Sequence, residues 1–189
     1  MSNVDPKTGI WSLEIASKRH KIDHRLCSAI IQLFDKPYSV ADVGCGIGEY
    51  CKTLTKYGWD NMVGFEGTKN ISSISVFDNI KEVDLTKIHY LGIFDFVLCI
   101  EVGEHIPSDY ECTFLNNICD MVDNTLLMSW ANVGQYSASG HVNCKHMHSV
   151  INELEDRGMS FDAEKSHYLQ EKAEFNWLKK NIAVFNNVR

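Results

Sequence analysis

The sequence predicts an α/β fold in which a mostly parallel sheet carries helices on both faces. Short apolar runs recur at fairly regular intervals after Pro37, and stretches of helical length separate most of them. The run Phe94–Ile100 is almost continuously apolar, as expected of a central strand that is covered on both faces. Strands that alternate with helices in this way favour a parallel arrangement.

The first predicted element is a segment with helix-like apolar spacing, which begins near Trp11 and is ended by Pro37. We expect it to form an N-terminal helical cap, residues 1–36, on a core of residues 37–189. The predicted strands of the core are Ser39–Val43, Met62–Phe65, Ile80–Val83, Phe94–Ile100, Thr125–Trp130 and Ile182–Phe185. The predicted helices are Tyr50–Tyr57, Asp109–Val122 and His146–Arg157, and the longest predicted loop is Asn132–Lys145.

Length and composition indicate one folded domain over residues 1–189, because the 21.5 kDa chain has 44% hydrophobic residues. A formal charge of −7 without a basic run disfavours nucleic acid as a partner and suits a small or neutral acceptor. The 7 cysteines contain no CxxC pair, so neither a disulfide framework nor a zinc knuckle is indicated. The polar start and the lack of a membrane-length apolar run predict a cytoplasmic protein.

A glycine-rich loop is the strongest signal, since a predicted strand runs into DxGxGxG at Asp42–Gly48 and then into a helix. Glycines there allow a sharp turn and close approach of a ligand to the backbone. The spacing differs from the GxGxxG fingerprint of dinucleotide sites, which favours S-adenosylmethionine over NAD.

Acids follow the next two predicted strands. Glu66 stands where a carboxylate can accept hydrogen bonds from both ribose hydroxyls. Asp84, followed by Leu85, suits an adenine amino group and an apolar wall for the adenine ring. The carboxyl ends of the strands thus predict a nucleoside-shaped site.

The ordered series DVGCGIG, GFE, VDL and FDFVLCIEVGEHIP resembles the class I S-adenosylmethionine-dependent methyltransferases. The resemblance implies a Rossmann-like fold with a seven-stranded sheet whose last strand is antiparallel. It also implies that the glycines line the methionine portion of S-adenosylmethionine, that Glu66 binds ribose and that Asp84 and Leu85 flank adenine. The predicted cofactor-binding residues are Asp42, Gly44, Cys45, Gly46, Gly48, Glu66, Asp84, Leu85 and Glu101.

Catalytic residues are predicted after the fourth strand, in Glu101-Val-Gly-Glu104-His105. His105 is a candidate base for an acceptor hydroxyl, and Glu101 and Glu104 stand beside it. The ExxEH pattern resembles that of the ubiquinone-pathway O-methyltransferases, where the acids and histidine are associated with a divalent cation. The pattern is also widespread in members without metal, so we predict no metal ligand. Two alternatives remain for these residues: they could bind a divalent cation, or the acids could lie at the start of a helix and cap its backbone amides.

The loop after the fifth predicted strand carries SWA, GQ and GHVN, an arrangement similar to methyltransferases found with polysaccharide-building enzymes. The resemblance implies a sugar hydroxyl as acceptor. Gln135, His141 and Asn143 could hydrogen-bond a glycan, and His141 is the rival to His105 as base. The alternative is a surface loop with an incidental histidine. The N-terminal segment could close over the cofactor, with Lys18, Arg19 or Arg25 near the cofactor's carboxylate.

Taken together, these motifs predict an O-methyltransferase that acts on a sugar, a glycan or a similar small acceptor. The alternatives are a phenolic or quinone-like acceptor, an amine or protein side chain, and a non-catalytic module that binds S-adenosylmethionine. The sequence leaves open the oligomeric state and whether the domain belongs to a larger polypeptide.

Overall fold

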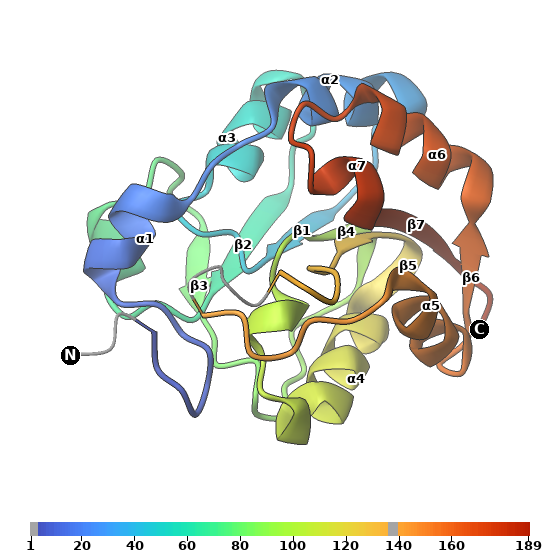
Figure 1. Cartoon of the computed structure of the whole chain (residues 1–189). Coiled ribbons are helices and arrows are strands. Elements are labelled where there is room, and N and C mark those ends of the chain that lie inside the picture. The colour runs from blue at the N-terminus through green and yellow to red at the C-terminus, as the bar shows by residue number, and fades with distance from the viewer. Residues whose placement is uncertain (1–3, 136–139) are drawn as a thin grey trace.

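A computed structural model describes residues 4–135 and 140–189 of the chain. One sheet organises it, with the strands in the order β3-β2-β1-β4-β5-β7-β6 (Figure 1). The strands are β1 (Val40–Val43), β2 (Met62–Glu66), β3 (Ile80–Glu82), β4 (Phe94–Cys99), β5 (Val122–Ser129), β6 (Met159–Asp162) and β7 (Ile182–Asn187). Strands β1 to β5 pair in parallel, whereas β7 is antiparallel to both β5 and β6. The predicted α/β fold with a seven-stranded sheet is confirmed, and the sheet is mixed rather than purely parallel.

Helices cover both faces of the sheet (Figure 1). Helices α2, α3 and α6 lie over one face, and α4 and α5 over the other. The helices are α1 (Leu13–Arg19), α2 (His24–Leu33), α3 (Glu49–Lys56), α4 (Glu111–Met121), α5 (Met147–Glu155), α6 (Ala163–Lys172) and α7 (Leu178–Asn181). None of the described helices is long and apolar enough to cross a membrane.

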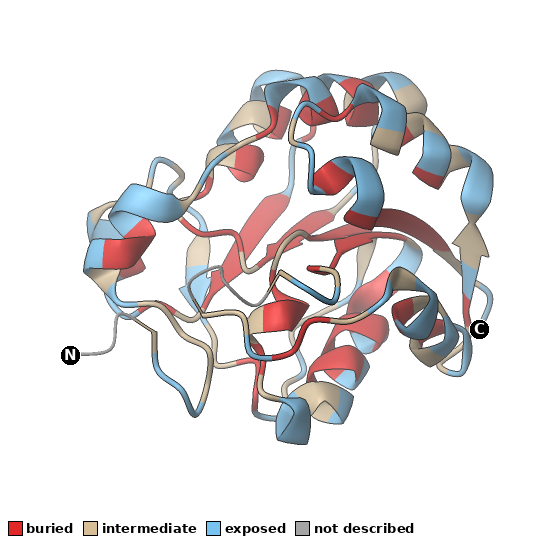
Figure 2. Ribbon diagram, viewed as in Figure 1, coloured by how far each residue is buried: buried red, intermediate tan, exposed pale blue. Residues whose placement is uncertain are grey.

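Side chains of successive strand residues point to opposite faces, and this alternation builds two apolar cores. In β4, Val97 and Cys99 pack with α4 and α5, whereas Phe96 and Leu98 pack with α2 and α3. All four are buried, and β4 is apolar except at Asp95 because both of its faces are covered. Figure 2 shows buried residues along the central strands of the sheet.

The six predicted strand runs all coincide with strands, but the sequence missed β6. This strand is short and lies at the edge of the sheet, and Met159 is its one buried residue, so its apolar pattern is weak. The boundary between α4 and β5 was also misplaced, because α4 ends at Met121 and β5 begins directly at Val122. Apolar periodicity does not mark a junction without a turn.

The N-terminal segment forms two helices, and Asp23 explains the break between them. Its buried carboxylate caps α2 by accepting the amide of Leu26 at 2.8 Å. The other oxygen accepts the amides of Glu174 and Phe175 at 2.7 and 2.9 Å. Asp23 therefore also fixes the segment that leads into α7.

Candidate active site

A cavity of about 580 Å³ opens where β1, β2 and β4 end. This is the edge at which open α/β sheets bind ligands, and the volume lies within the roughly 300–1,000 Å³ of small-molecule sites. Its lining comes from the loops after these strands, the segment after β3, the loop after β5, the N-terminal segment and the segment that leads into α7. The predicted site residues among its lining are Asp42, Gly44, Cys45, Glu66, Leu85, Glu101, His105, Gln135 and His141.

The glycine loop turns sharply between β1 and α3. Gly44, Gly46 and Gly48 have φ of 72°, 57° and 85°, a region that other residues rarely adopt. A Cβ atom on Gly44 would lie 2.3 Å from Val102, and one on Gly46 would lie 2.5 Å from the ring of His20. Gly44 and Cys45 line the cavity, whereas Gly46 and Gly48 shape the turn behind it.

Glu66 ends β2, as predicted, and its buried carboxylate holds the glycine loop. Its Oε2 accepts the amide of Gly46 at 3.0 Å. Its Oε1 accepts both the amide and the hydroxyl of Thr68, each at 2.9 Å. The same side chain lines the cavity, so one carboxylate can order the loop and meet a ligand.

Asp42 is a buried acid on β1 that also lines the cavity. Burial raises its pKa to about 7, although the hydrogen bond that it accepts from the thiol of Cys51 at 3.4 Å lowers the pKa. A positively charged ligand group nearby would favour its ionised form.

The two residues predicted to flank adenine are separated. Leu85 lines the main cavity, whereas Asp84 lines an adjoining cavity of about 690 Å³ under the N-terminal segment. The Asp84 carboxylate accepts the amide and hydroxyl of Thr86 at 3.1 and 2.6 Å and pairs with Lys87 at 3.0 Å. Burial raises its pKa, but these contacts outweigh burial and lower it. Its role toward adenine stays a prediction.

Glu101 follows β4 in a left-handed conformation, with a φ of 58° that is rare for a residue other than glycine. The hydroxyl of Ser129 holds it there, since this hydroxyl accepts the amide of Glu101 and donates to its Oε1, both at 2.8 Å. Burial raises the pKa of Glu101, while the Ser129 hydrogen bond lowers it. Backbone strain at a cavity wall is typical of functional positions.

Glu104 lies three residues further along the same turn and is fully buried. Neither of its carboxylate oxygens has a hydrogen-bond partner among the described residues. Burial raises its pKa well above the ordinary value, and the charge of Glu101 raises it further. The amides of Glu104 and Ala131 lie near enough to lower the pKa but make no hydrogen bond to the carboxylate. An orphaned carboxylate of this kind requires an explanation.

Four rings form one wall of the cavity: those of Trp11, His20, His105 and His141. Trp11 stacks on His20 with ring centroids 5.2 Å apart, and His105 meets Trp11 and His141 edge-on at 5.2 and 5.0 Å. Burial lowers the pKa of His105 to about 4, and the neighbouring His141 adds to this effect. Burial also lowers the pKa of His141. Neutral imidazoles can accept a proton.

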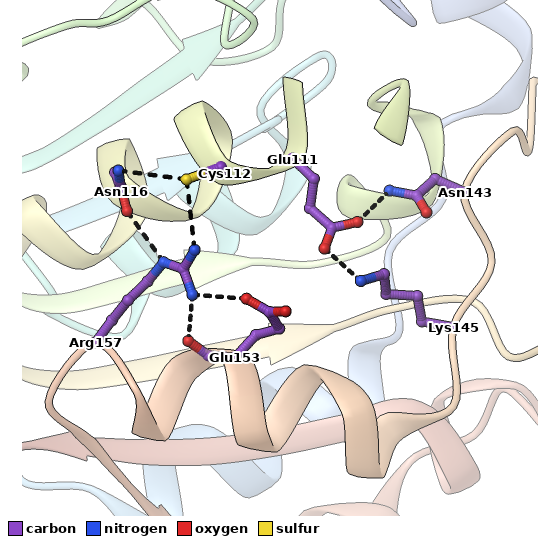
Figure 3. Close-up of polar contacts among 7 residues, drawn as sticks. All are labelled: Glu111, Cys112, Asn116, Asn143, Lys145, Glu153 and Arg157. Atoms are coloured by element: carbon purple, nitrogen blue, oxygen red, sulfur yellow. Dashed lines mark hydrogen bonds and ion pairs between the residues drawn. The ribbon is translucent and has the colours of Figure 1, made fainter. Parts of the chain in front are cut away.

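The loop after β5 is fastened to α4 by polar contacts of Asn143 and Lys145. Asn143 donates its side-chain amide to Glu111 at 2.7 Å, and Lys145 pairs with the same carboxylate (Figure 3). The carbonyl of Asn143 accepts the indole N–H of Trp130 at 2.6 Å. Asn143 is thus engaged away from the cavity, unlike Gln135 and His141. Residues 136–139 of the predicted loop lie outside the described residues.

Sequence reasoning missed several lining residues that come from the two ends of the chain. Trp11 and His20 reach the cavity from the N-terminal segment, and Phe175 and Trp177 from the segment before α7. Of the cations considered near the cofactor, Arg19 lines the cavity, whereas Lys18 pairs with Glu14 on the surface. No local motif marks these aromatic residues, because their positions depend on contacts between distant segments.

A family model described as a methyltransferase domain matches residues 18–158. The match includes the glycine loop, Glu66 and the ExxEH turn, but not Trp11, Phe175 or Trp177. No curated protein sequence matches the chain.

Solved structures with the same fold include magnesium protoporphyrin IX methyltransferase ChlM from Synechocystis PCC 6803 with bound S-adenosylhomocysteine. Its TM-score is 0.64 at 14% identity, over 92% of this chain and 92% of that chain. The N-methyltransferase NodS from Bradyrhizobium japonicum WM9, also with S-adenosylhomocysteine, has a TM-score of 0.65 at 14% identity, over 88% of this chain and 85% of that chain. The cyclase SpnF has a TM-score of 0.62 at 13% identity, over 86% of this chain and 80% of that chain. At these identities the likeness shows the fold alone.

Proposed function

The chain belongs to the methyltransferase-domain family, and on that premise we propose that it methylates a hydroxyl group of a sugar, a glycan or a similar small acceptor. S-Adenosylmethionine is the methyl donor. The observation that carries the proposal is that two imidazoles, those of His105 and His141, line the same cavity as the buried carboxylate of Glu66.

The donor half of the site lies around the glycine loop. S-Adenosylmethionine, when bound, supplies a methyl group made electrophilic by its sulfonium. Glu66 would accept the ribose hydroxyls, and Leu85 would contact the adenine ring. Leu85 suits this contact better than Asp84 does, because the Asp84 carboxylate is engaged by Thr86 and Lys87.

The charge of the cavity lining also suits this donor. The carboxylates of Asp42, Glu49, Glu66 and Glu101 line the cavity against two cations, Arg19 and Lys21. An acidic lining favours a ligand with a sulfonium and an ammonium group. Arg19 or Lys21 would pair with the ligand's single carboxylate.

The acceptor half lies at the wall of rings. The imidazole of His105 or His141 takes the hydroxyl proton while the acceptor oxygen bonds to the methyl carbon. The carbon–sulfur bond breaks at the same time, and its electron pair stays on sulfur, which yields S-adenosylhomocysteine and a methyl ether. The protein's main contribution is to hold the acceptor oxygen in line with the methyl group.

A phenolic or quinone-like acceptor is the second candidate, and the aromatic wall favours it. Flat rings such as those of Trp11 and Trp177 can stack on a phenol as well as on a sugar face. NodS is described as an N-methyltransferase and ChlM as acting on magnesium protoporphyrin IX. Since SpnF is described as a cyclase, a non-methylating role on this fold also has to be tested.

The test is binding followed by turnover. Calorimetry should show saturable binding of S-adenosylmethionine and S-adenosylhomocysteine to the folded protein. Incubation with labelled S-adenosylmethionine and a panel of glycosides, phenols and amines should give a methylated glycoside, identified by mass spectrometry. Folded protein that does not bind S-adenosylmethionine would refute the proposal. Methylation of phenols or amines alone would refute the sugar acceptor, and binding without any turnover would favour a binding module.

A further inference from the structure

We propose that Glu111, which starts α4 and is not among the residues that line the cavity, is a positioning residue for the two candidate bases His105 and His141. It acts through residues 140–145 of the loop after β5, which we call the strap. Its effect on the orientation of the two imidazoles does not depend on the proposed function, whereas its effect on turnover rests on that function.

Both carboxylate oxygens of Glu111 bind the strap. Oε2 accepts the side-chain amide of Asn143 at 2.7 Å, and Oε1 pairs with the ammonium group of Lys145 (Figure 3). The side chains of Glu111 and Lys145 are only 13% and 23% exposed, so salt screens this pair less than it screens a surface pair. Hydrogen bonds to an ionised group belong to the stronger class. Here they join α4 to residues 32 and 34 positions further along the chain.

The strap is also bound to the turn that follows β4. The carbonyl of Glu104 accepts two strap amides at 2.9 and 3.0 Å, and the carbonyl of Asn143 accepts the indole N–H of Trp130 at 2.6 Å. A Cβ atom on Gly103 would lie 2.3 Å from this indole, so the turn packs directly on the ring. The strap therefore cannot move away from α4 without disturbing the turn that carries His105.

The strap determines how both imidazoles lie. The carbonyl of Gly140 lies 3.0 Å from Nδ1 of His105. A carbonyl oxygen can only accept a hydrogen bond, so the neutral ring carries its proton on Nδ1 and its lone pair on Nε2. The next strap residue is His141, whose ring meets that of His105 edge-on with centroids 5.0 Å apart. A displaced strap would move one candidate base and remove the contact that selects the tautomer of the other.

The expected effect on catalysis follows from geometry rather than from charge. Misplacing a reacting group by about 1 Å can lower a rate about 100-fold. Glu111 does not line the cavity, and the donor half of the site is built on the glycine loop and Glu66. Loss of Glu111 should therefore lower turnover without changing the affinity for S-adenosylmethionine.

A purely structural role is the alternative, because an acid in the first turn of a helix also stabilises that helix. Glu111→Gln and Glu111→Ala separate the two roles. Both variants remove the charge at the start of α4, but glutamine keeps an oxygen that can accept the amide of Asn143. A charge effect on the helix would be equal in the two variants, whereas a positioning role gives the larger effect in Glu111→Ala.

The first measurement reports the strap itself and needs no acceptor. Hydrogen exchange is followed by NMR on ¹⁵N-labelled full-length protein at Val142, Asn143 and Lys145, whose amides are bonded to carbonyls outside the strap. A hydrogen bond to a charged group corresponds to a factor of about 10 to 150 in an equilibrium constant. Glu111→Ala should therefore raise the exchange rates of these amides at least about 10-fold, and Glu111→Gln should raise them less.

The second measurement reports the imidazoles through their ¹⁵N signals, which distinguish the tautomers and are assigned with the His105→Ala and His141→Ala variants. Wild-type His105 should be in the Nδ1–H form, and Glu111→Ala should give a mixture of tautomers and shift the signals of His141. Glu153→Ala is the matched control, because it removes an acid of the neighbouring α5 whose partner Arg157, at 2.8 Å, lies outside the strap (Figure 3). It should leave the exchange rates and the imidazole signals unchanged.

Turnover is measured with a glycoside or phenol that the wild-type protein methylates. Glu111→Ala should lower kcat about 100-fold and leave the Kd for S-adenosylmethionine unchanged. Changed exchange and imidazole signals in a protein that methylates no acceptor of the panel would count against the proposed function and leave the positioning role standing.

Three results would overturn the inference: wild-type His105 in the Nε2–H form, exchange and imidazole signals in Glu111→Ala that equal those of wild type, or equal effects of Glu111→Ala and Glu111→Gln. If Glu111→Ala does not fold, as judged by circular dichroism, Lys145→Met decides by the same two measurements, because it removes one of the two contacts of the carboxylate.

Discussion

Replacing Glu66 by Gln tests whether one buried carboxylate both holds the glycine loop and binds ribose. Oε2 of Glu66 accepts the amide of Gly46 at 3.0 Å, and Oε1 accepts the amide and hydroxyl of Thr68 at 2.9 Å. Glutamine has the same shape but one oxygen and one NH₂ group. In either orientation of glutamine, the NH₂ group faces a backbone N–H, and two donors cannot bond to each other.

The magnitude follows from the hydrogen bonds that are lost. A hydrogen bond to a charged group contributes about 1.5–3 kcal/mol, and an orphaned buried donor costs about 1–3 kcal/mol. Since the hydroxyl of Thr68 can rotate to donate or accept, we count a single orphaned amide. The free energy of unfolding should therefore fall by about 2–3 kcal/mol. A loss of this size in ribose binding would weaken affinity for S-adenosylmethionine roughly 30- to 150-fold.

Urea denaturation without ligand measures the first effect, and calorimetry with S-adenosylmethionine measures the second. Glu49→Gln is the matched control, because it removes the same charge from the same cavity without touching these hydrogen bonds. We expect that control to change the free energy of unfolding by less than about 0.5 kcal/mol. Equal losses in the two variants would refute the argument, because charge alone would then account for them.

Three further predictions concern the glycine loop, a buried acid and the acceptor side. Gly46→Ala should weaken S-adenosylmethionine binding at least about 10-fold by calorimetry, because its Cβ would lie 2.5 Å from His20 at a φ of +57°. Gly134→Ala, at a φ of +99° with no atom of the described residues within 4 Å of its Cβ, controls for strain alone, and equal losses would contradict the steric argument. Burial raises the pKa of Asp42 from 3.8 to about 7, so the folded state holds this proton more tightly and the free energy of unfolding falls as pH rises from about 4 to about 7. The full effect is about 4 kcal/mol, so Asp42→Asn should exceed wild type in Tm at pH 8 and approach it at pH 4, and a difference that does not vary with pH would contradict this reasoning. His105→Ala should lower kcat about 10²- to 10⁴-fold and leave the Kd for S-adenosylmethionine unchanged. A loss confined to the binding of S-adenosylmethionine would refute the assignment of His105 to the acceptor half of the site.

The α/β fold and the glycine loop could be predicted because their signals are local. A run of apolar residues forms a strand wherever it can be covered, and three glycines spaced by two allow the turn that follows β1. Glu66 could be placed for the same reason, since it ends the next strand. Strand β6 was missed because an edge strand with one buried residue carries almost no apolar pattern.

The acceptor side could be predicted only in part, because its residues meet through long-range contacts. The sequence suggested His105 and His141 as rival bases, whereas the structure places their rings 5.0 Å apart in one wall. Asn143 shows the opposite outcome, since it belongs to the same motif as His141 but bonds to Glu111 instead. Neighbouring residues of a loop can face different surroundings, and their spacing in the sequence does not predict which of them faces the cavity.

The sequence by itself thus determined the order along the chain of the strands that carry the donor-side motifs. It also determined the turn of the glycine loop and the acid at the end of β2. Each of these depends on backbone preferences and apolar patterning within a few residues. Only the tertiary structure decided that Glu104 is buried without a hydrogen-bond partner among residues 4–135 and 140–189, that His141 lies near it, and that Trp11 and Trp177 line the cavity. These features depend on how segments far apart in the chain pack, and no local residue pattern encodes such packing.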